Sequence, residues 1–410
     1  MKIRSITYFV NPGWPIQAAI FKQAGEFLAA ARPEFESAGY VVDTTRLASI
    51  PFPKLLADCS GAALTELAQE LEAKASQAGF DYVSLGPALP ERPESYAAIP
   101  IALAATQNAF FAGLMTTPNG GVSLPAVLAC AKVIRECAGV SEDGFGNLRF
   151  AALANVDPGA PFFPAAYGGG DLPAFAIASE AADLAVQAFS QASSLQEAVE
   201  NLVKSIEKHA DALKSVAQDL ARQSGMRFGG LDLTPAPFPE EQRSLGTALE
   251  RLGVPATGQH GSLAASAILA DALDRAHYPR AGFNGLMLPV LEDWTLARRA
   301  AEGSLTVNDL LLYSAVCGTG LDTIPLPGDT SQEALTAVLL DLAALSQRLD
   351  KPLTARLMPI PGKQAGDPTG FDFPYFANSR VMALQASELQ GPLAGSDEFS
   401  LHPRRSIAQS

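Results

Sequence analysis

The chain has few cysteines and few basic residues for its length. Only four of its 410 residues are cysteine, and 29 lysine and arginine residues stand against 43 aspartate and glutamate residues. No Cys-x-x-Cys pair is present, which indicates a reduced protein without disulfide bonds. With a net charge of −14 and no basic stripe, nucleic acid is not expected as a partner.

A secretion signal and a long apolar run are also missing. After Met1 the sequence enters a strand pattern directly, without the charged leader, apolar block and cleavage site of a signal peptide. The most apolar stretch, 97–115, is interrupted by Pro100, Thr106 and Asn108, which favours a buried helix followed by a strand over a membrane span. These absences predict a cytoplasmic protein without a membrane partner. A homo-oligomer remains an open alternative.

The usual motifs for nucleotides and compact metal sites do not occur either. There is no Gly-x-Gly-x-x-Gly after the first predicted strand, no Gly-x-x-x-x-Gly-Lys-Ser/Thr and no His-Glu-x-x-His. The cofactor is therefore unknown from the sequence. A divalent metal ion held by carboxylates from separate segments is the one cofactor that the polar residues suggest.

Apolar sequence is abundant: 48% of the residues are hydrophobic and 18% are charged, enough for a large core. Strand-like and helix-like runs alternate, which predicts an α/β protein with parallel sheet under covering helices. Ligands in such proteins bind at the carboxyl ends of the strands. The predicted strands are 5–10, 40–45, 82–85, 110–115 and 149–154 in the first half, and 227–232, 285–291, 321–324, 354–358 and, more weakly, 380–384 in the second.

Two long helices are predicted between the halves, over 174–191 and 195–223. The whole arrangement then forms one domain of two similar halves. Its predicted boundaries are 1–384 for the domain, 1–160 and 225–384 for the halves, 174–224 for the helical divider and 385–410 for a C-terminal tail.

Two similar segments each place an acid in an apolar strand. Residues 230–237 read Gly-Leu-Asp-Leu-Thr-Pro-Ala-Pro, and residues 320–327 read Gly-Leu-Asp-Thr-Ile-Pro-Leu-Pro. A buried carboxylate is costly unless it is paired or used. Asp232 and Asp322 are therefore the leading catalytic candidates and, with Asp293, candidate metal ligands.

Other polar residues near the later strand ends extend this candidate site. Glu292, His260 and Lys363 are candidate catalytic residues, and Lys363 would neutralise an anionic substrate. Structural alternatives stay open: Asp293 is placed to cap the helix predicted from Trp294, and His260 to stand at a helix entry.

Polar residues of the first half are candidates for substrate binding. They are Asn119, Arg149, Asn155 and Tyr167. Asn119 also fits a plain turn, and Tyr167 fits either a pocket wall or the core. Cys317 fits core packing better than a nucleophile, because no histidine can be assigned to it.

Several motifs, in order along the chain, resemble the signature of the DUF711 family, also called UPF0210, which is functionally uncharacterised. They are Asn147-Leu148-Arg149-Phe150 through Asn155, Pro161-Phe162-Phe163-Pro164 through Tyr167, Gly229-Gly230-Leu231-Asp232 through Pro237, Gly258-Gln259-His260-Gly261, Leu288-Pro289-Val290-Leu291-Glu292-Asp293, Cys317 through Thr330, and Pro359 through Gly366.

The resemblance implies a fold similar to the pyruvate formate-lyase-like glycyl radical enzymes. That fold is a ten-stranded α/β barrel of two five-stranded parallel halves, set antiparallel to each other, which matches the five-plus-five strand count. Radical chemistry does not carry over, because those enzymes need a glycine near the C-terminus and Arg380-Val381-Met382-Ala383 has none. A shared fold does not fix the reaction.

We therefore expect an enzyme that acts on a small molecule by acid–base or metal-assisted polar chemistry in a carboxylate-lined pocket. A lyase, an isomerase and a hydrolase all fit this description. One alternative is a non-catalytic ligand-binding or regulatory protein on an enzyme scaffold. A second is an atypical glycyl radical relative.

Overall fold

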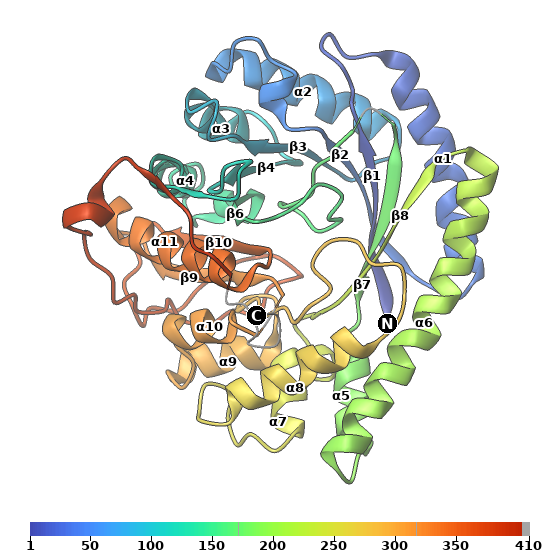
Figure 1. Cartoon of the computed structure of the whole chain (residues 1–410), viewed down its shortest axis with the longest axis vertical. Coiled ribbons are helices and arrows are strands. Elements are labelled where there is room, and N and C mark those ends of the chain that lie inside the picture. Colours follow the sequence, from blue (N-terminus) through green and yellow to red (C-terminus); the bar gives the residue numbers. More distant parts are fainter. Residues whose placement is uncertain (171, 317, 404–410) are drawn as a thin grey trace.

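A computed structural model of the chain describes residues 1–170, 172–316 and 318–403. Its centre is a nine-stranded, mostly parallel sheet in the order β8-β7-β1-β2-β3-β4-β6-β10-β9 (Figure 1). Five neighbouring strands run parallel: β1 (Lys2–Val10), β2 (Val42–Ser49), β3 (Tyr82–Ala88), β4 (Ala109–Leu114) and β6 (Phe150–Ala154). The five strands predicted for the first half of the chain are thereby confirmed.

A pair of strands flanks this central set on each side. On one side β7 (Ala174–Glu180) runs antiparallel to β1, and β8 (Arg227–Ala236) runs parallel to β7. On the other side β10 (Leu353–Ile360) runs antiparallel to β6, and β9 (Gly320–Pro327) runs parallel to β10. The two flanking pairs therefore point in the direction opposite to the central five.

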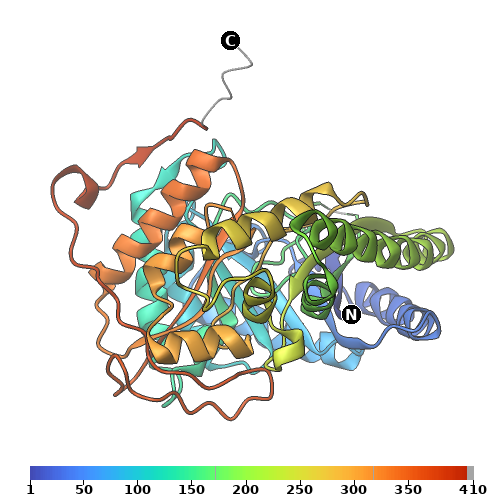
Figure 2. The same cartoon turned by 90° about the horizontal axis from the view of Figure 1, so that it is seen from below.

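Helices lie around the outside of the sheet (Figure 1), because its strands are buried on both faces. They are α1 (Ala18–Ser37), α2 (Gly61–Gln77), α3 (Glu94–Ala104), α4 (Leu124–Ala138), α5 (Ala182–Gln191), α6 (Leu195–Ser224), α7 (Leu245–Arg251), α8 (Ser262–Arg275), α9 (Trp294–Glu302), α10 (Val307–Tyr313) and α11 (Gln332–Leu349). Figure 2 shows the long α6 beside α1 on one side of the molecule and the C-terminal segment on the other.

The prediction of a helix over 174–191 is wrong in its first part. Residues 174–180 form β7, and only the remainder is helical, as α5. Every residue of β7 is buried, because the strand lies between β1 and β8 under helices. Burial on both faces removes the alternation typical of a strand, and three alanines in this short run favour a helix by propensity.

Two other segments that were predicted to be strands do not form strands in the structure. Residues 285–291 form no strand, but their neighbourhood bridges both edges of the sheet: Arg280 pairs with Leu231 of β8, and Pro289 pairs with Asp322 of β9, both in parallel. Residues 380–384 also form no strand, and Arg380 makes a single antiparallel bridge with Pro368. The segment 280–290 is thus hydrogen-bonded to strands at opposite ends of the nine-strand order.

The described part of the C-terminal tail is attached to the body. Its strand β11 (Glu398–Phe399) pairs with β5 (Val122–Ser123), and the main chain of His402 accepts a hydrogen bond from Arg348. Short 3-10 helices complete the chain: η1 (Phe52–Lys54), η2 (Phe145–Arg149), η3 (Glu241–Arg243) and η4 (Gly391–Ala394). Among the described residues, no helix combines the length and apolar character needed to cross a bilayer.

Candidate functional site

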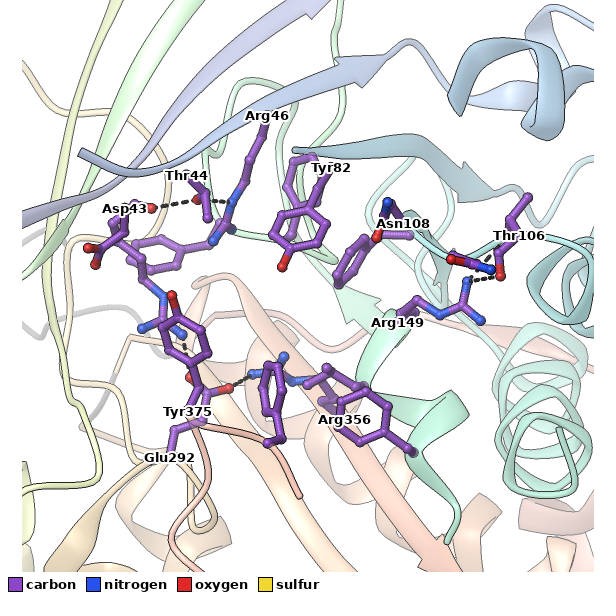
Figure 3. A pocket seen from close by; sticks show the side chains of 18 of the residues that line it. Asp43, Thr44, Arg46, Tyr82, Thr106, Asn108, Arg149, Glu292, Arg356 and Tyr375 are labelled. Carbon is purple, nitrogen blue, oxygen red and sulfur yellow. Dashed lines mark hydrogen bonds and ion pairs between the residues drawn. The ribbon is translucent and has the colours of Figure 1, made fainter. Parts of the chain in front are cut away.

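An arginine-lined cavity of about 410 Å³, which we call the main cavity, lies at the amino ends of the five parallel strands (Figure 3). It is lined from the first residues of β1, β2 and β3 and from the turns before β4 and β6. Its polar lining consists of Arg4, Asp43, Thr44, Arg46, Tyr82, Thr106, Gln107, Asn108, Arg149, Glu292, Arg356 and Tyr375. This volume lies within the usual range for small-molecule sites.

The position of the cavity follows from the antiparallel flanking strands. The carboxyl ends of β9 and β10 point toward the amino ends of β1 to β4 and β6. Glu292 enters from the turn after the segment 280–290, and Arg356 enters from β10. The cavity therefore lies at the carboxyl ends of strands from the second half of the chain and at the amino ends of strands from the first half.

Six charged side chains form an alternating ion network beside the cavity. In spatial order they are Arg243, Glu180, Arg4, Glu292, Arg356 and Asp322. They come from η3, β7, β1, the turn before α9, β10 and β9, so the network joins both flanking pairs to the central strands. Three arginines balance three carboxylates, and the network as a whole is neutral.

Arg356 is the most fully paired member of this network. Its Nε lies 2.6 Å from Asp322 Oδ1, and its Nη2 lies 3.0 Å from Asp322 Oδ2 and 2.5 Å from Glu292 Oε1. The pairing of β9 with β10 shifts register between Ala355 and Leu357, which places Arg356 at a bulge. In β9, the Thr323 φ of 44° is unusual for a β-branched residue. The extra residue of the bulge is in β9, where Asp322 and Thr323 together stand opposite Arg356, and a bulge of this kind re-aims a side chain, here the Asp322 carboxylate toward the guanidinium.

The network sets the protonation of its acids. Burial acts to raise the pKa of Glu292, but the guanidinium groups of Arg356 and Arg4 hold this pKa below its usual value. Burial raises the pKa of Asp322 against the pull of Arg356, and the charge of Glu292 adds to the rise. Glu292 is therefore held as a carboxylate, whereas Asp322 is the acid of this pair that takes a proton first as the pH falls.

Arg46 and Arg149 are the two cavity arginines outside the network, and Arg46 is the one whose terminal nitrogens are free. Its side chain is 9% exposed, and its Nε donates to Thr44 Oγ1 at 2.9 Å. Within residues 1–170, 172–316 and 318–403, no carboxylate forms an ion pair with it and no protein atom accepts from its terminal nitrogens. Burial and the nearby charge of Arg4 lower the pKa of Arg46 to about 10, so the side chain remains charged at neutral pH. An anion in the cavity is the partner that this geometry lacks.

Asp43 and Tyr375 are the groups of the cavity that best suit proton transfer. Asp43 Oδ1 lies 3.6 Å from the Lys2 ammonium, and its Oδ2 is buried without a hydrogen-bond partner in the described chain. Burial, and then the charge of Asp43, raise the pKa of Tyr375. The tyrosine is thus kept as a hydrogen-bond donor beside a carboxylate that is not bonded to an arginine (Figure 3).

A doubled-back segment near the C-terminus forms one wall of the cavity. Main-chain bonds from Gly366 to Val381 and from Thr369 to Ser379 join its two arms. Phe373 and Tyr375 at its tip line the cavity, and the Phe373 ring packs against Phe145 of η2 at a centroid distance of 5.1 Å. Residues far apart in the sequence therefore close the site together.

Of the predicted catalytic residues, the structure brings Glu292 and Asp322 together through Arg356, while Asp232 lies elsewhere. The Asp232 carboxylate accepts hydrogen bonds from Thr234 Oγ1 at 2.7 Å and from the main-chain N–H groups of Thr234, Phe283 and Asn284 at 3.1, 2.7 and 3.0 Å. It fastens the segment 282–284 to β8. Burial raises its pKa, although these four donors favour the charged form.

We expect the substitution Asp232→Asn to lower the free energy of unfolding by about 1–3 kcal/mol, because its amide nitrogen would meet an N–H donor. Urea unfolding measures this loss. Asp274→Asn is the matched control, since the Asp274 side chain is 76% exposed. An unchanged unfolding free energy together with lost ligand binding or turnover would instead support the catalytic role predicted for Asp232.

The other predicted acid–base and metal residues also have separate surroundings. The Asp293 carboxylate caps α9 by accepting from the N–H groups of Thr295 and Leu296, which confirms the structural alternative. His260 is exposed in the turn before α8, and Lys363 is half-buried; neither lines the main cavity. The described residues contain no group of three or more His, Cys, Asp or Glu side chains that could hold a metal ion. Cys317 lies outside the described residues.

The predicted substrate-binding residues are divided between the two ends of the sheet. Arg149 lines the main cavity, but its guanidinium donates to the main-chain carbonyls of Leu103, Thr106 and Ala109. Asn155 lines a separate cavity of about 330 Å³ at the carboxyl ends of the central strands. Asn119 is exposed in a turn, and the Tyr167 hydroxyl donates to the Val156 carbonyl at 2.6 Å in the core.

The cavity residues that the prediction missed are mainly arginines and their neighbours. Arg356 stands inside the predicted strand 354–358, so the argument applied to Asp322, that a charge in an apolar strand needs a partner, applies equally to it. Arg46 follows the predicted strand 40–45 directly after two threonines, so the same argument does not apply to it. For Arg4, Asp43 and Tyr375 the sequence contains no comparable signal.

The fold and the cavity define an α/β protein with a mostly parallel nine-stranded sheet and a buried, arginine-lined pocket. The chain belongs to the family described as "Uncharacterised ACR (DUF711)", whose sequence profile matches residues 1–378. The family predicted from the motifs is thereby confirmed.

Relatives in other organisms carry the second family name. A UPF0210 protein of Pyrobaculum aerophilum is 31% identical over 396 residues, covering 90% of this chain and 87% of its own length. A UPF0210 protein of Oleidesulfovibrio alaskensis is 28% identical over 405 residues, covering 94% of this chain and 87% of its own length. The similarity therefore extends over nearly the whole chain, and these names state no activity.

Proposed function

We propose that the protein is an enzyme that acts on a small organic anion by acid–base chemistry in the arginine-lined cavity. The observation that carries the proposal is Arg46, a buried cation without an ion-pair partner in the described chain. Leaving a buried charge unpaired is costly, so such a residue is retained where a ligand completes the pair. The ligand anion would accept hydrogen bonds from the terminal nitrogens of Arg46.

Asp43 and Tyr375 supply the proton transfer in this proposal. Asp43 is the carboxylate of the cavity that no arginine holds, so it is free to accept a proton from the bound ligand. Tyr375 keeps its proton at neutral pH because burial and Asp43 raise its pKa, and it would donate to a developing oxyanion. Glu292 and Asp322 act as positioning residues that hold Arg4 and Arg356 in place.

We also propose that the sheet closes into a ten-stranded barrel similar to that of the pyruvate formate-lyase-like enzymes. The bridges from 280–290 to β8 and to β9 support this, because they make that segment the middle member of a second parallel set, β7, β8, 280–290, β9 and β10. An experimental structure in which 280–290 is separated from either strand would contradict closure.

A ligand panel tests the function. The full chain is incubated with small carboxylic acids and phosphate esters in D₂O, and melting temperature, deuterium incorporation and conversion of the ligand are measured. We expect organic acids to raise the melting temperature by mass action and at least one of them to exchange a proton or to be converted. Asp43→Asn should retain the binding and lose the exchange, because only the proton acceptor is removed.

The non-catalytic alternative predicts a different result from the same panel. Because every network carboxylate is already paired with an arginine, the cavity also suits simple ligand capture. Acids that stabilise the wild type and Asp43→Asn equally, with no exchange or conversion in either, would favour a binding protein. A panel without any stabilising anion would overturn both readings.

A further inference from the structure

Two opposite walls of the main cavity are aromatic. They constrain the shape of the part of a ligand that carries its anionic group. On the first wall, the ring centroid of Phe110 lies 5.4 Å from that of Tyr82 and 5.4 Å from that of Phe163. On the second wall, Phe373 packs against Phe145 at 5.1 Å and against Tyr375 at 5.3 Å. Figure 3 shows Tyr82 and Tyr375 on opposite sides of the cavity.

The free cation belongs to the first aromatic wall. The Arg46 guanidinium carbon lies 5.2 Å from the centroid of the Phe163 ring and 5.9 Å from that of Tyr82. An anion bound to the terminal nitrogens of Arg46 would therefore have ring faces next to it. The rest of the ligand, to which the anionic group is attached, would lie between the two aromatic walls.

The partners of the cavity arginines limit which kind of anionic group the cavity can bind. Arg4 and Arg356 are already neutralised by Glu292, Glu180 and Asp322, and Arg149 donates to main-chain carbonyls. Of the four arginines that line the cavity, only Arg46 has no hydrogen-bond acceptor for either terminal nitrogen among the described residues. One guanidinium with two free terminal nitrogens offers a single fork, which matches the two oxygens of one carboxylate and leaves further oxygens of a phosphate monoester without a comparable donor.

We propose that the ligand is a monocarboxylate carried on a planar, aromatic or conjugated body. This inference rests on the proposed function, which requires only that the cavity takes a small organic anion. The carboxylate binds Arg46 in a fork geometry. The planar body fills the space between the aromatic walls, where flat apolar groups gain more contact than puckered ones of equal size.

Four matched probes test the proposal by calorimetric titration of the full chain: cinnamate, 3-cyclohexylpropanoate, cinnamamide and phenyl phosphate. We expect cinnamate to bind about fivefold more tightly than its saturated, puckered analogue. Cinnamamide, which lacks the charge, should bind at least about 30-fold more weakly, and phenyl phosphate should also be weaker than cinnamate.

Two variants test whether the aromatic walls cause the preference for cinnamate over 3-cyclohexylpropanoate. Phe163→Leu on one wall and Phe373→Leu on the other should each reduce the preference for cinnamate over the cyclohexyl analogue while cinnamate still exceeds cinnamamide. Phe373 lies on the doubled-back segment and Phe163 after β6, so misfolding of one variant leaves the other to decide.

The outcomes separate this inference from the function on which it rests. If the cyclohexyl acid binds as tightly as cinnamate, or if phenyl phosphate binds more tightly, the planar monocarboxylate is overturned while the anion site stands. If neither these acids nor any other organic anion binds, the proposed function falls as well.

Discussion

Replacing Arg356 with methionine should lower the free energy of unfolding by about 3–5 kcal/mol, the largest loss of stability that we expect from a single change in the ion network. Arg356 is 6% exposed and holds both Asp322 and Glu292. Its removal leaves Asp322 without an arginine and Glu292 with Arg4 alone. Urea unfolding at neutral pH measures the loss directly.

The loss should depend on pH in a defined direction. In the wild type, the lowered pKa of Glu292 contributes stability above the unfolded-state pKa, and this contribution is lost as the pH falls through the folded-state value. Without Arg356, burial raises the folded-state pKa of Asp322 further and that of Glu292 as well. A raised pKa removes stability as the pH rises, so the difference between variant and wild type should be largest at pH 7 and smaller near pH 4.5.

Two further variants make the test specific. Arg298→Met removes an arginine whose side chain is 51% exposed and should change stability by less than about 0.5 kcal/mol. Adding Asp322→Asn to Arg356→Met should restore part of the loss, because one uncompensated charge disappears. If Arg356→Met costs no more than Arg298→Met, or if its cost does not shrink on acidification, the network is not held together as described.

The sequence predicts the central five strands because each is a short run rich in apolar or β-branched residues between helical segments. It fails at β7, where burial on both faces and an alanine-rich composition favour a helix. It also fails at 285–291, where the pairing with β9 is limited to a single bridge at Pro289 and the bridge to β8 is made earlier, at Arg280. In both places the neighbouring strands determine the structure, and those neighbours come from distant parts of the chain.

For the site, the sequence correctly indicates that the buried acids Asp322 and Asp232 need partners, but it does not reveal which residues those partners are. Asp322 and Arg356 are 34 residues apart, and Arg4 and Glu292 are 288 residues apart. No local spacing reveals such contacts. The matching segments around Asp232 and Asp322 predict equivalent roles, yet Asp232 binds main-chain N–H groups and Asp322 binds an arginine. The difference arises because β9 lies beside β10, which carries Arg356, whereas β7 beside β8 carries no arginine.

The substitution Arg46→Met should weaken ligand binding without lowering stability, whereas Arg356→Met should lower stability. We expect the free energy of unfolding to be unchanged or higher by on the order of 1 kcal/mol, because the change removes a buried charge that lacks a counterpart in the described chain. The organic acid that most stabilises the wild type should bind about 2–5 kcal/mol more weakly, a loss of roughly 30-fold or more. Urea unfolding and calorimetric titration on the same sample measure both effects.

This separation of stability from binding distinguishes a ligand-holding arginine from a structural one. Arg46→Lys retains the charge and loses the planar fork, so it should bind the acid with intermediate affinity and increase the salt dependence of binding. A structural Arg46 would behave like Arg356, and its replacement by methionine would lower stability by several kcal/mol. That result, or undiminished affinity in Arg46→Met, would overturn the anion-binding role of Arg46 and remove the observation that carries the proposed function. Arg4 and Arg356 offer no substitute, because they already have carboxylate partners.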